Sequence, residues 1–300
     1  MATNDNPGTG PLFGALQQAG LPKPATLTES GGDNRASKKN WAQRFSNALA
    51  MTVAEQLRPK YPNARVTPRP DGSGQEFSVG GKVDRKRTDV GIWDDAAGLV
   101  AGVSIKTYTF RDTHKATKTK PAWITRYVRN VKRNDMELRD EADTLHRRQP
   151  YAVLTALFFM NEDACWDGVA GQSSFAHVVF TLRKRTGRAG PDARFDLFEH
   201  VFIGLFDEAG HVRFFDVRQS PRRNQPPAES ETISLADVLD KLDDAVILRN
   251  TGVSRNERYA EDDPYWTAPA GSLPADLESE EPLTLDEVIE SAGEENATDI

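Results

Sequence analysis

The apolar run from Tyr151 to Met160 constrains this chain more than any other feature of its sequence. A helix that spans a bilayer requires about 20 apolar residues, so this run is too short to cross a membrane. It directly follows Pro150, and its length and continuity are typical of a strand that is buried on both faces. A strand of that kind lies inside a sheet that is covered on both sides, which predicts an α/β fold.

Periodic patterns on both sides of this run predict the neighbouring elements. An amphipathic helix is predicted by a stripe of apolar residues spaced four apart: Trp41, Phe45, Leu49 and Val53. Strands are predicted at 74–81, a short segment between glycines, and at 88–95, where Val90 and Ile92 alternate on one face. A third strand is predicted at 99–110, which is rich in β-branched and aromatic residues. A long polar helix is predicted at about 123–149, ending before Pro150.

Additional elements are predicted after the apolar run. Strands are expected at 175–183, 197–206 and 211–218. A last helix is expected to begin after Ser234, which reads as its N-cap, with Asp237 completing a weak capping box. The predicted architecture is a mixed central sheet flanked by helices, with strands added at its C-terminal side.

The charges of the chain are segregated along the sequence. The formal net charge is −7, but residues 251–300 hold 14 acidic residues against two arginines. Residues 34–148 hold 24 Lys and Arg against 13 Asp and Glu. A basic body with an acidic tail favours an anionic partner such as nucleic acid, although a solvated charged surface has the same composition.

Composition also predicts the division into domains. Residues 1–35 are rich in Gly, Pro, Asn and Thr and are expected to be a disordered leader. Residues 251–300 are acidic and interrupted by prolines, and they are expected to be a mostly disordered tail. One domain, 36–250, remains between them.

Several classes of protein are excluded by what the sequence lacks. A single cysteine, Cys165, excludes intrachain disulfides and fits a cytoplasmic protein. The five histidines are dispersed and there are no cysteine pairs, so a zinc site is not expected. Neither a phosphate-binding P-loop nor a dinucleotide-binding fingerprint is present.

Three residues on the second and third predicted strands could assemble a site for phosphodiester hydrolysis. Asp89 lies near the start of one strand, and Ser104 and Lys106 lie on the next. Residues i and i+2 of a strand share a face, so Ser104 and Lys106 are expected side by side while Ile105 points into the core. Hydrolysis of a phosphodiester uses a carboxylate-bound metal, a water and a cation near the phosphate.

This arrangement resembles the PD-(D/E)xK nuclease superfamily, in which an Asp opens one strand and an acid-x-Lys triplet lies on the next. The order helix, three strands, helix, strand over residues 41–160 also resembles the core of restriction endonucleases. The resemblance implies a Mg²⁺- or Mn²⁺-dependent DNA endonuclease, in restriction or another defence against foreign DNA. It implies that Asp89 and the backbone carbonyl of Ile105 bind the metal and that Lys106 acts on the attacking water or the phosphate.

The sequence departs from the family pattern at Ser104, which replaces the acid of the triplet. A hydroxyl is a poor ligand for Mg²⁺, which prefers carboxylates, so a second acid is expected from elsewhere. Glu76 on the first predicted strand and Glu55 on the first helix are the candidates, with Glu76 favoured. Glu137 and Glu141, four residues apart, are interpreted as surface charges of the long helix.

Two basic segments beside the predicted site are expected to contact DNA. They precede Asp89 and follow the strand of Lys106, and their cations would neutralise phosphates. The residues are Arg85, Lys86, Arg87, Arg111, Lys115, Lys118, Lys120 and Arg126. Trp123 and Tyr127 could stack on a base, but their spacing is more typical of core residues.

Two alternatives remain open on the sequence alone. The chain could be a catalytically inactive nuclease-fold protein that only binds DNA, or an interaction protein whose acidic tail imitates DNA or covers its own basic surface. The candidate partners are double-stranded DNA, a second copy of the chain, and a DNA methyltransferase or other defence subunit; no membrane association is expected.

Overall fold

The structure is a computed structural model in which most of the predicted domain is described. The described residues are 35–74, 77–79, 86–94, 97–108, 113–114, 123–124, 127–128, 130–168, 172–207 and 209–251, together with Leu12 and Gly14. Almost all of the predicted leader and tail therefore lies outside the described residues. No helix in the described part of the chain combines the length and apolar character needed to span a bilayer.

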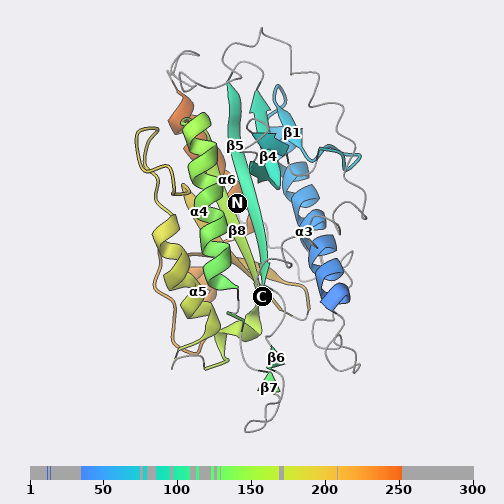
Figure 1. Ribbon diagram of the computed structural model, residues 1–300, viewed down its shortest axis with the longest axis vertical. Helices are drawn as coiled ribbons and strands as arrows, with labels where there is room; N and C mark the ends of the chain where they lie inside the picture. Colours follow the sequence, from blue (N-terminus) through green and yellow to red (C-terminus); the bar gives the residue numbers. More distant parts are fainter. Residues whose placement is uncertain are drawn as a thin grey trace, which may run out of the picture.

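Six strands form one open sheet in the order β1-β4-β5-β8-β9-β10. Their bounds are β1 (Arg65–Thr67), β4 (Val90–Asp94), β5 (Gly98–Tyr108), β8 (Val153–Asn161), β9 (His200–Phe206) and β10 (Val212–Asp216). β5, β8 and β9 run parallel, while β1 and β4 on one side and β10 on the other are antiparallel to their neighbours. The expected mixed sheet is confirmed (Figure 1).

In the part of the chain from residue 35 to 251 that the structure describes, four helices cover the sheet. They are α3 (Arg35–Leu57), α4 (Val131–Arg148), α5 (Ser174–Leu182) and α6 (Leu235–Asn250). Short 3-10 turns are η1 (Arg58–Lys60), η2 (Glu162–Cys165), η4 (Arg183–Arg185) and η5 (Glu229–Glu231). Two further two-stranded ladders pair β2 (Phe77–Val79) with β3 (Lys86–Thr88), and β6 (Thr113–His114) with β7 (Trp123–Ile124).

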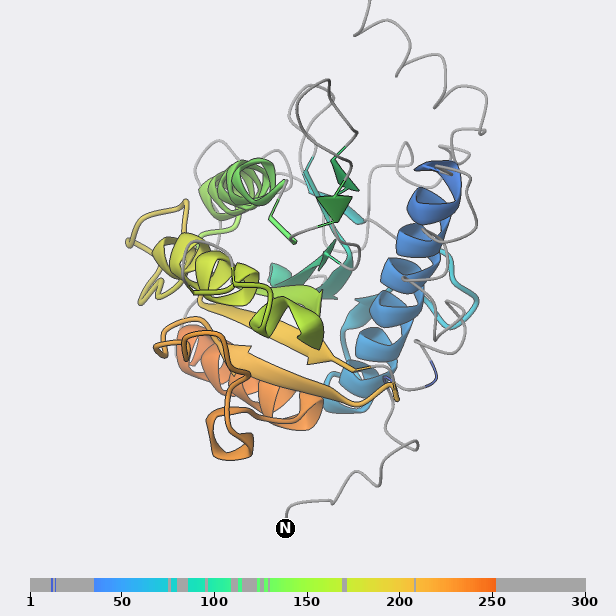
Figure 2. The same cartoon turned by 90° about the horizontal axis from the view of Figure 1, so that it is seen from below.

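The core is divided into two layers by the sheet. On one face, α3 and α6 pack against Val103, Ile105 and the odd-numbered residues of β8 such as Leu157. On the other face, α4 and α5 pack against the even-numbered residues of β8 such as Phe158. Figure 2 shows α4 and α5 apart from α3 and α6. β8 is buried from Val153 to Met160, which confirms the prediction that the apolar run 151–160 forms a strand buried on both faces.

The register of β5 decides which of its residues meet α4. Ile105 is 4% exposed and belongs to the layer beneath α3. Ser104 and Lys106 point to the opposite face, where Lys106 is paired in register with Phe158 of β8. The alternation expected for this strand is confirmed, and it places the serine and the lysine under α4.

Two predicted elements were wrong in kind or extent. Residues 175–183 were expected to be a strand but form α5, whose N-cap Ser173 accepts a hydrogen bond from the Ala176 amide. Burial of Phe175, Val178, Val179 and Leu182 follows a helical spacing that a run of β-branched residues concealed. The long helix begins at Val131, not 123, and the Tyr127 amide donates instead to Ser174 Oγ.

The first strand of the core was also assigned wrongly. Within 74–81, β2 forms but pairs with β3, away from the six-stranded sheet. The strand beside β4 is β1, which prolines at 62 and 68 hid from the sequence reading. The order helix, three strands, helix, strand is still present, as α3, β1, β4, β5, α4 and β8.

Candidate active site

Asp89 is the residue that precedes β4, and its carboxylate reaches across to β5. Its Oδ2 accepts a hydrogen bond from the backbone amide of Ile105 at 2.6 Å. The neighbouring residue Val90 pairs with Val103, so Asp89 lies level with Ser104 at the point where the β4–β5 ladder ends. This hydrogen bond fixes the carboxylate beside the strand that carries Ser104 and Lys106.

Glu141 of α4 is the residue that joins this group and was missed by the sequence reading. Its Oε2 accepts a hydrogen bond from Ser104 Oγ at 3.0 Å and lies 3.5 Å from Lys106 Nζ. Glu141 is only 5% exposed, so its interpretation as a surface charge of the helix was wrong. We call Asp89, Ser104, Lys106 and Glu141 the carboxylate–lysine cluster.

A signal for the burial of Glu141 was present in the sequence. Glu141 lies three residues after Leu138 and four before Leu145, so it occupies the buried stripe of the helix. The four-residue spacing from the partly exposed Glu137 led to the wrong prediction that Glu141 lies on the solvent-facing side of the helix. An acid in an apolar stripe requires a partner, and here the partners come from β5.

The charges of the cluster alter one another. Burial raises the pKa of Glu141 above its ordinary value, and the nearby Asp89 carboxylate raises it further. Lys106 and the Ser104 hydroxyl act in the opposite direction without outweighing burial. For Lys106, burial lowers the pKa, but Glu141, Asp89 and Glu137 together outweigh it and hold the pKa above 10.5. The cluster therefore holds two close carboxylates against one ammonium group.

The two acids proposed from the sequence have different outcomes. Glu55 is exposed on α3, which covers the face opposite Ser104 and Lys106, so the structure does not bring it to the cluster. Glu76 lies outside the described residues, and its role stays a prediction. Asp94 ends β4 and accepts a hydrogen bond from the Ala97 amide at 2.8 Å.

The predicted DNA-contacting side chains cannot be placed. Lys86 and Arg87 lie in β3 with only their backbone described. The remaining residues lie outside the described part of the chain: Arg85, Arg111, Lys115, Lys118, Lys120 and Arg126. Tyr127 is 3% exposed and packs in the α4 layer, which confirms the expectation that it is a core residue.

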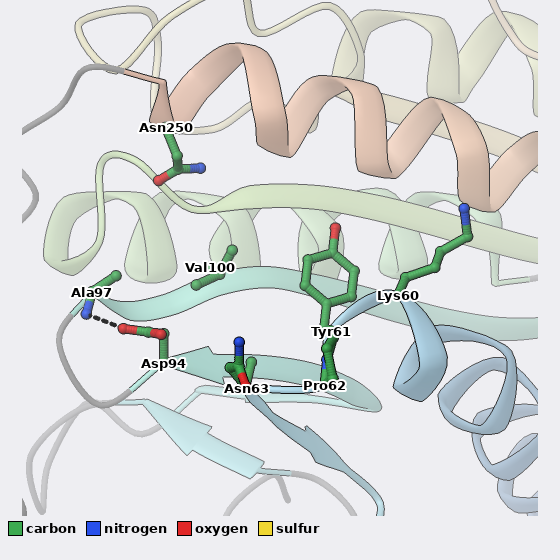
Figure 3. A pocket seen from close by; sticks show the side chains of 9 residues that line it. Lys60, Tyr61, Pro62, Asn63, Asp94, Ala97, Val100 and Asn250 are labelled. Atoms are coloured by element: carbon green, nitrogen blue, oxygen red, sulfur yellow. Dashed lines mark hydrogen bonds between the residues drawn. The ribbon is translucent and has the colours of Figure 1, made fainter.

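A cavity of about 330 Å³ lies away from the cluster, between η1, the start of β5 and the end of α6 (Figure 3). Its lining includes Lys60, Tyr61 and Asn250. The Tyr61 hydroxyl donates to Asp243 at 2.7 Å, Lys60 pairs with Asp240 at 2.7 Å, and Asn250 donates to the Val246 carbonyl. Because these polar groups already have partners within the protein, the cavity does not compete with the cluster as a candidate site.

The oxygen-rich chemistry of the cluster fits a hard divalent cation. Asp89 and Glu141 supply carboxylates, and Ile105, whose amide donates to Asp89, lies between Ser104 and Lys106 in the sequence of β5. Hard cations such as Mg²⁺ take oxygen ligands of this kind and complete their shell with water. Among the described residues, no group of three or more His, Cys, Asp and Glu side chains is arranged to hold a metal.

Comparison of the chain with protein-family models, with curated proteins and with solved structures found no match.

Proposed function

We propose that this chain is a Mg²⁺-dependent DNA endonuclease of the PD-(D/E)xK type, in which Glu141 supplies the carboxylate that Ser104 lacks. One observation carries the proposal: Ser104 and Lys106 both contact Glu141 Oε2, with Asp89 anchored on the intervening Ile105. Glu141 of α4 thereby places a carboxylate next to Ser104, the strand position at which the family pattern has an acid. Mn²⁺ is expected to replace Mg²⁺, because both take oxygen ligands.

In this proposal each residue of the cluster has a distinct role. Asp89 and Glu141 would hold the cation, which would polarise the phosphate and lower the pKa of a water bound to it. Lys106 would donate hydrogen bonds to the scissile phosphate and offset the negative charge that develops there. Ser104 would orient Glu141 through its hydroxyl, as it does in this structure.

Lys106 would have to exchange partners when DNA binds. In the structure its ammonium group lies 3.5 Å from Glu141, and it would turn from this carboxylate toward a phosphate. A cation bound by Glu141 would satisfy the carboxylate in place of Lys106. The side chain of Lys106 is 23% exposed, so it is the member of this pair that solvent and substrate can reach.

The basic segments that neighbour the cluster in the sequence support DNA as the substrate. One includes the first two residues of β3, and the other follows the end of β5, the strand that carries both Ser104 and Lys106. Phosphate contacts from such segments give affinity without sequence specificity. The proposal therefore includes cleavage of duplex DNA, and restriction or another defence role is the biological setting we favour.

Cleavage of a supercoiled plasmid tests the proposal. The purified protein is expected to nick or linearise it with Mg²⁺ or Mn²⁺ and to leave it intact with EDTA. Asp89→Asn, Glu141→Gln and Lys106→Met should each reduce cleavage by at least about 100-fold, as expected for groups acting at the reacting phosphate. Glu55→Gln is the control, since Glu55 is exposed on the other side of the sheet.

The variants also separate the competing assignments. If Glu76→Gln abolishes cleavage and Glu141→Gln does not, Glu76 is the second acid and the assignment of Glu141 is wrong. If the wild-type protein binds DNA and cleaves none with any divalent cation, the chain is an inactive nuclease-fold binding protein. Circular dichroism of each variant establishes that lost cleavage does not reflect unfolding.

A further inference from the structure

Three of the seven buried residues of α4 are ionisable: Asp135, Glu141 and His146. They share the inward face of the helix with Leu138 and Leu145. A buried ionisable group destabilises the folded state unless it has a hydrogen-bonding or ion-pair partner. Their partners lie on three different parts of the chain, so the axial position of α4 on the sheet affects all of them together.

The first partner of α4 is η4. Arg185 donates to both carboxylate oxygens of Asp135, at 2.6 and 3.3 Å, and Lys184 pairs with the same carboxylate at 2.8 Å. Asp135 is 6% exposed and Arg185 is 9% exposed. A bidentate pair of this kind fixes both distance and orientation.

The second partner is the segment that leads into β9. The Nδ1 of His146 lies 3.0 Å from the Phe195 carbonyl, and its Nε2 lies 3.6 Å from Glu199 Oε2. Glu199 also accepts a hydrogen bond from the Leu154 amide and pairs with Arg188 and Arg249. This buried group therefore connects the end of α4 to the start of β8, β9 and the end of α6.

The two contacts bracket Glu141. At a rise of 1.5 Å per residue, Asp135 and His146 are about 16 Å apart along the helix, with Glu141 between them. A slip of α4 by one turn, about 5.4 Å, would break both contacts and carry Glu141 away from Ser104 and Lys106. Apolar packing of Leu138 and Leu145 alone would penalise such a slip far less, because an apolar surface is not directional.

We propose that the Asp135–Arg185 ion pair and the contact of His146 Nδ1 with the Phe195 carbonyl are positioning contacts that hold α4 at the one axial position where Glu141 faces Ser104 and Lys106. The functional meaning of this positioning depends on the proposed nuclease site, but the geometric part does not. Residues 184–199 supply a partner toward each end of the helix, and we call these two contacts the clamp.

A pair of apolar substitutions tests the clamp without leaving a buried charge unpaired. In Asp135→Leu/Arg185→Met the ion pair is replaced by side chains of similar size, while Lys184 is exposed and Asp196 keeps Arg194. Such replacements often preserve overall stability. The matched control is Arg222→Gln/Glu231→Gln, which removes an exposed pair in the segment before α6.

The measured quantity is the coupling free energy between Lys106 and Glu141. It is obtained from a double-mutant cycle with Lys106→Met and Glu141→Gln, measured by urea unfolding in EDTA. The cycle is run in the wild type, in Asp135→Leu/Arg185→Met (the clamp variant) and in the control. We expect the coupling in the clamp variant to fall to about half of its wild-type value or less, and to be unchanged in the control. Equal coupling in all three backgrounds would overturn the proposal. If the clamp variant does not fold, Asp135→Asn replaces it, with the same criterion.

Mn²⁺ binding gives the second measurement and separates the two proposals. We expect the clamp variant to bind Mn²⁺ about tenfold more weakly than wild type, and the difference to vanish in a Glu141→Gln background. A difference that persists without Glu141 counts against positioning. If wild-type protein binds no Mn²⁺, the nuclease proposal fails, while the metal-free coupling still decides whether the clamp positions Glu141.

Discussion

The hydroxyl of Ser104 donates a hydrogen bond of 3.0 Å to the carboxylate of Glu141, joining the middle of β5 to the middle of α4. Ser104 is 1% exposed and Glu141 5%, so the contact is shielded from water. The side chains of Ser104 on the strand and Glu141 on the helix thus meet at one enclosed site, which contains the Glu141 carboxylate. This relationship predicts that the acid can be moved from one element to the other.

Transfer of the carboxylate is tested with Ser104→Asp and Ser104→Asp/Glu141→Gln. The single variant places a second buried carboxylate against Glu141 and should destabilise the fold by about 3 kcal/mol, as an uncompensated buried charge does. The double variant keeps one carboxylate and one hydrogen-bonding amide, so it should recover most of that stability. It should also cleave DNA faster than Glu141→Gln alone.

Urea unfolding and plasmid cleavage measure the two effects. Ser104→Asn serves as the control, because it introduces the same volume without a charge. A single Ser104→Asp variant as stable as wild type would show that the two side chains do not share one enclosed site.

The pH dependence of stability should report the burial of Glu141. Burial raises the pKa of Glu141 above the 4.5 of an unfolded chain, and Asp89 adds to the increase. A carboxyl group with a raised pKa contributes its full stability below its unfolded pKa and loses it as the pH rises through the folded pKa. Wild-type stability relative to Glu141→Gln should therefore decrease as the pH rises from below 4.5.

The measurement is urea unfolding in EDTA over a series of pH values, with the exposed Glu55→Gln as a control. The stability difference between wild type and Glu55→Gln should change much less over the same range. A difference for Glu141→Gln that grows with rising pH would mean that its pairing with Lys106 outweighs burial.

Glu199 should show the opposite dependence on pH. Burial alone would raise its pKa, but His146, Arg249 and the Leu154 amide outweigh burial and hold the pKa below 4.5. The group thus contributes stability above its unfolded pKa and loses it as the pH falls through the folded pKa. Glu199→Gln should cost about 3–5 kcal/mol at neutral pH, since Arg188 and Arg249 lose their buried partner.

The cost of Glu199→Gln should shrink when wild type and variant are compared below the folded pKa of Glu199. Chemical unfolding at neutral and acidic pH measures this change, and Glu229→Gln in η5, an exposed position, is the control. A cost that is the same at both pH values would assign the effect to packing and not to charge.

The basic segment after β5 should control the salt dependence of DNA binding. Replacing Lys115, Lys118 and Lys120 with Gln should weaken binding and reduce the slope of log K against log salt by about 2–3, or about 0.9 for each lost phosphate contact. Binding is measured by fluorescence anisotropy in EDTA between low and moderate salt. Arg223→Gln/Lys241→Gln removes cations elsewhere and should leave the slope nearly unchanged; equal slopes for all proteins would exclude the segment from the interface.

The parts of the fold that follow simple periodicity were predictable from the sequence. Alternation of Val90 and Ile92, the apolar run of β8 and the capping box at Ser234 each specify local structure by themselves. The strand β1 has three residues between prolines and is defined by its pairing with β4, not by its own pattern. Residues 174–182 form a helix because tertiary burial and the Ser173 cap outweigh β-branched propensity.

The site was only half predictable for a related reason. Asp89, Ser104 and Lys106 are close in sequence and come together through one hairpin, so strand geometry alone relates them. Glu141 lies 37 residues after Ser104 and reaches it only through the placement of α4 on the sheet. In the proposed clamp that placement depends on Arg185 and on the Phe195 carbonyl, which no local pattern around Glu141 reveals.

The parallel pairing of β8 with β9 sets a lower limit on the length of a fragment that can fold by itself. A fragment that stopped after Asn161 would contain all four residues of the carboxylate–lysine cluster. It would nevertheless leave β8 as an open edge with unpaired backbone groups, along a strand whose two faces are apolar. Such a fragment should aggregate, so the shortest autonomous unit is expected to continue at least through β9.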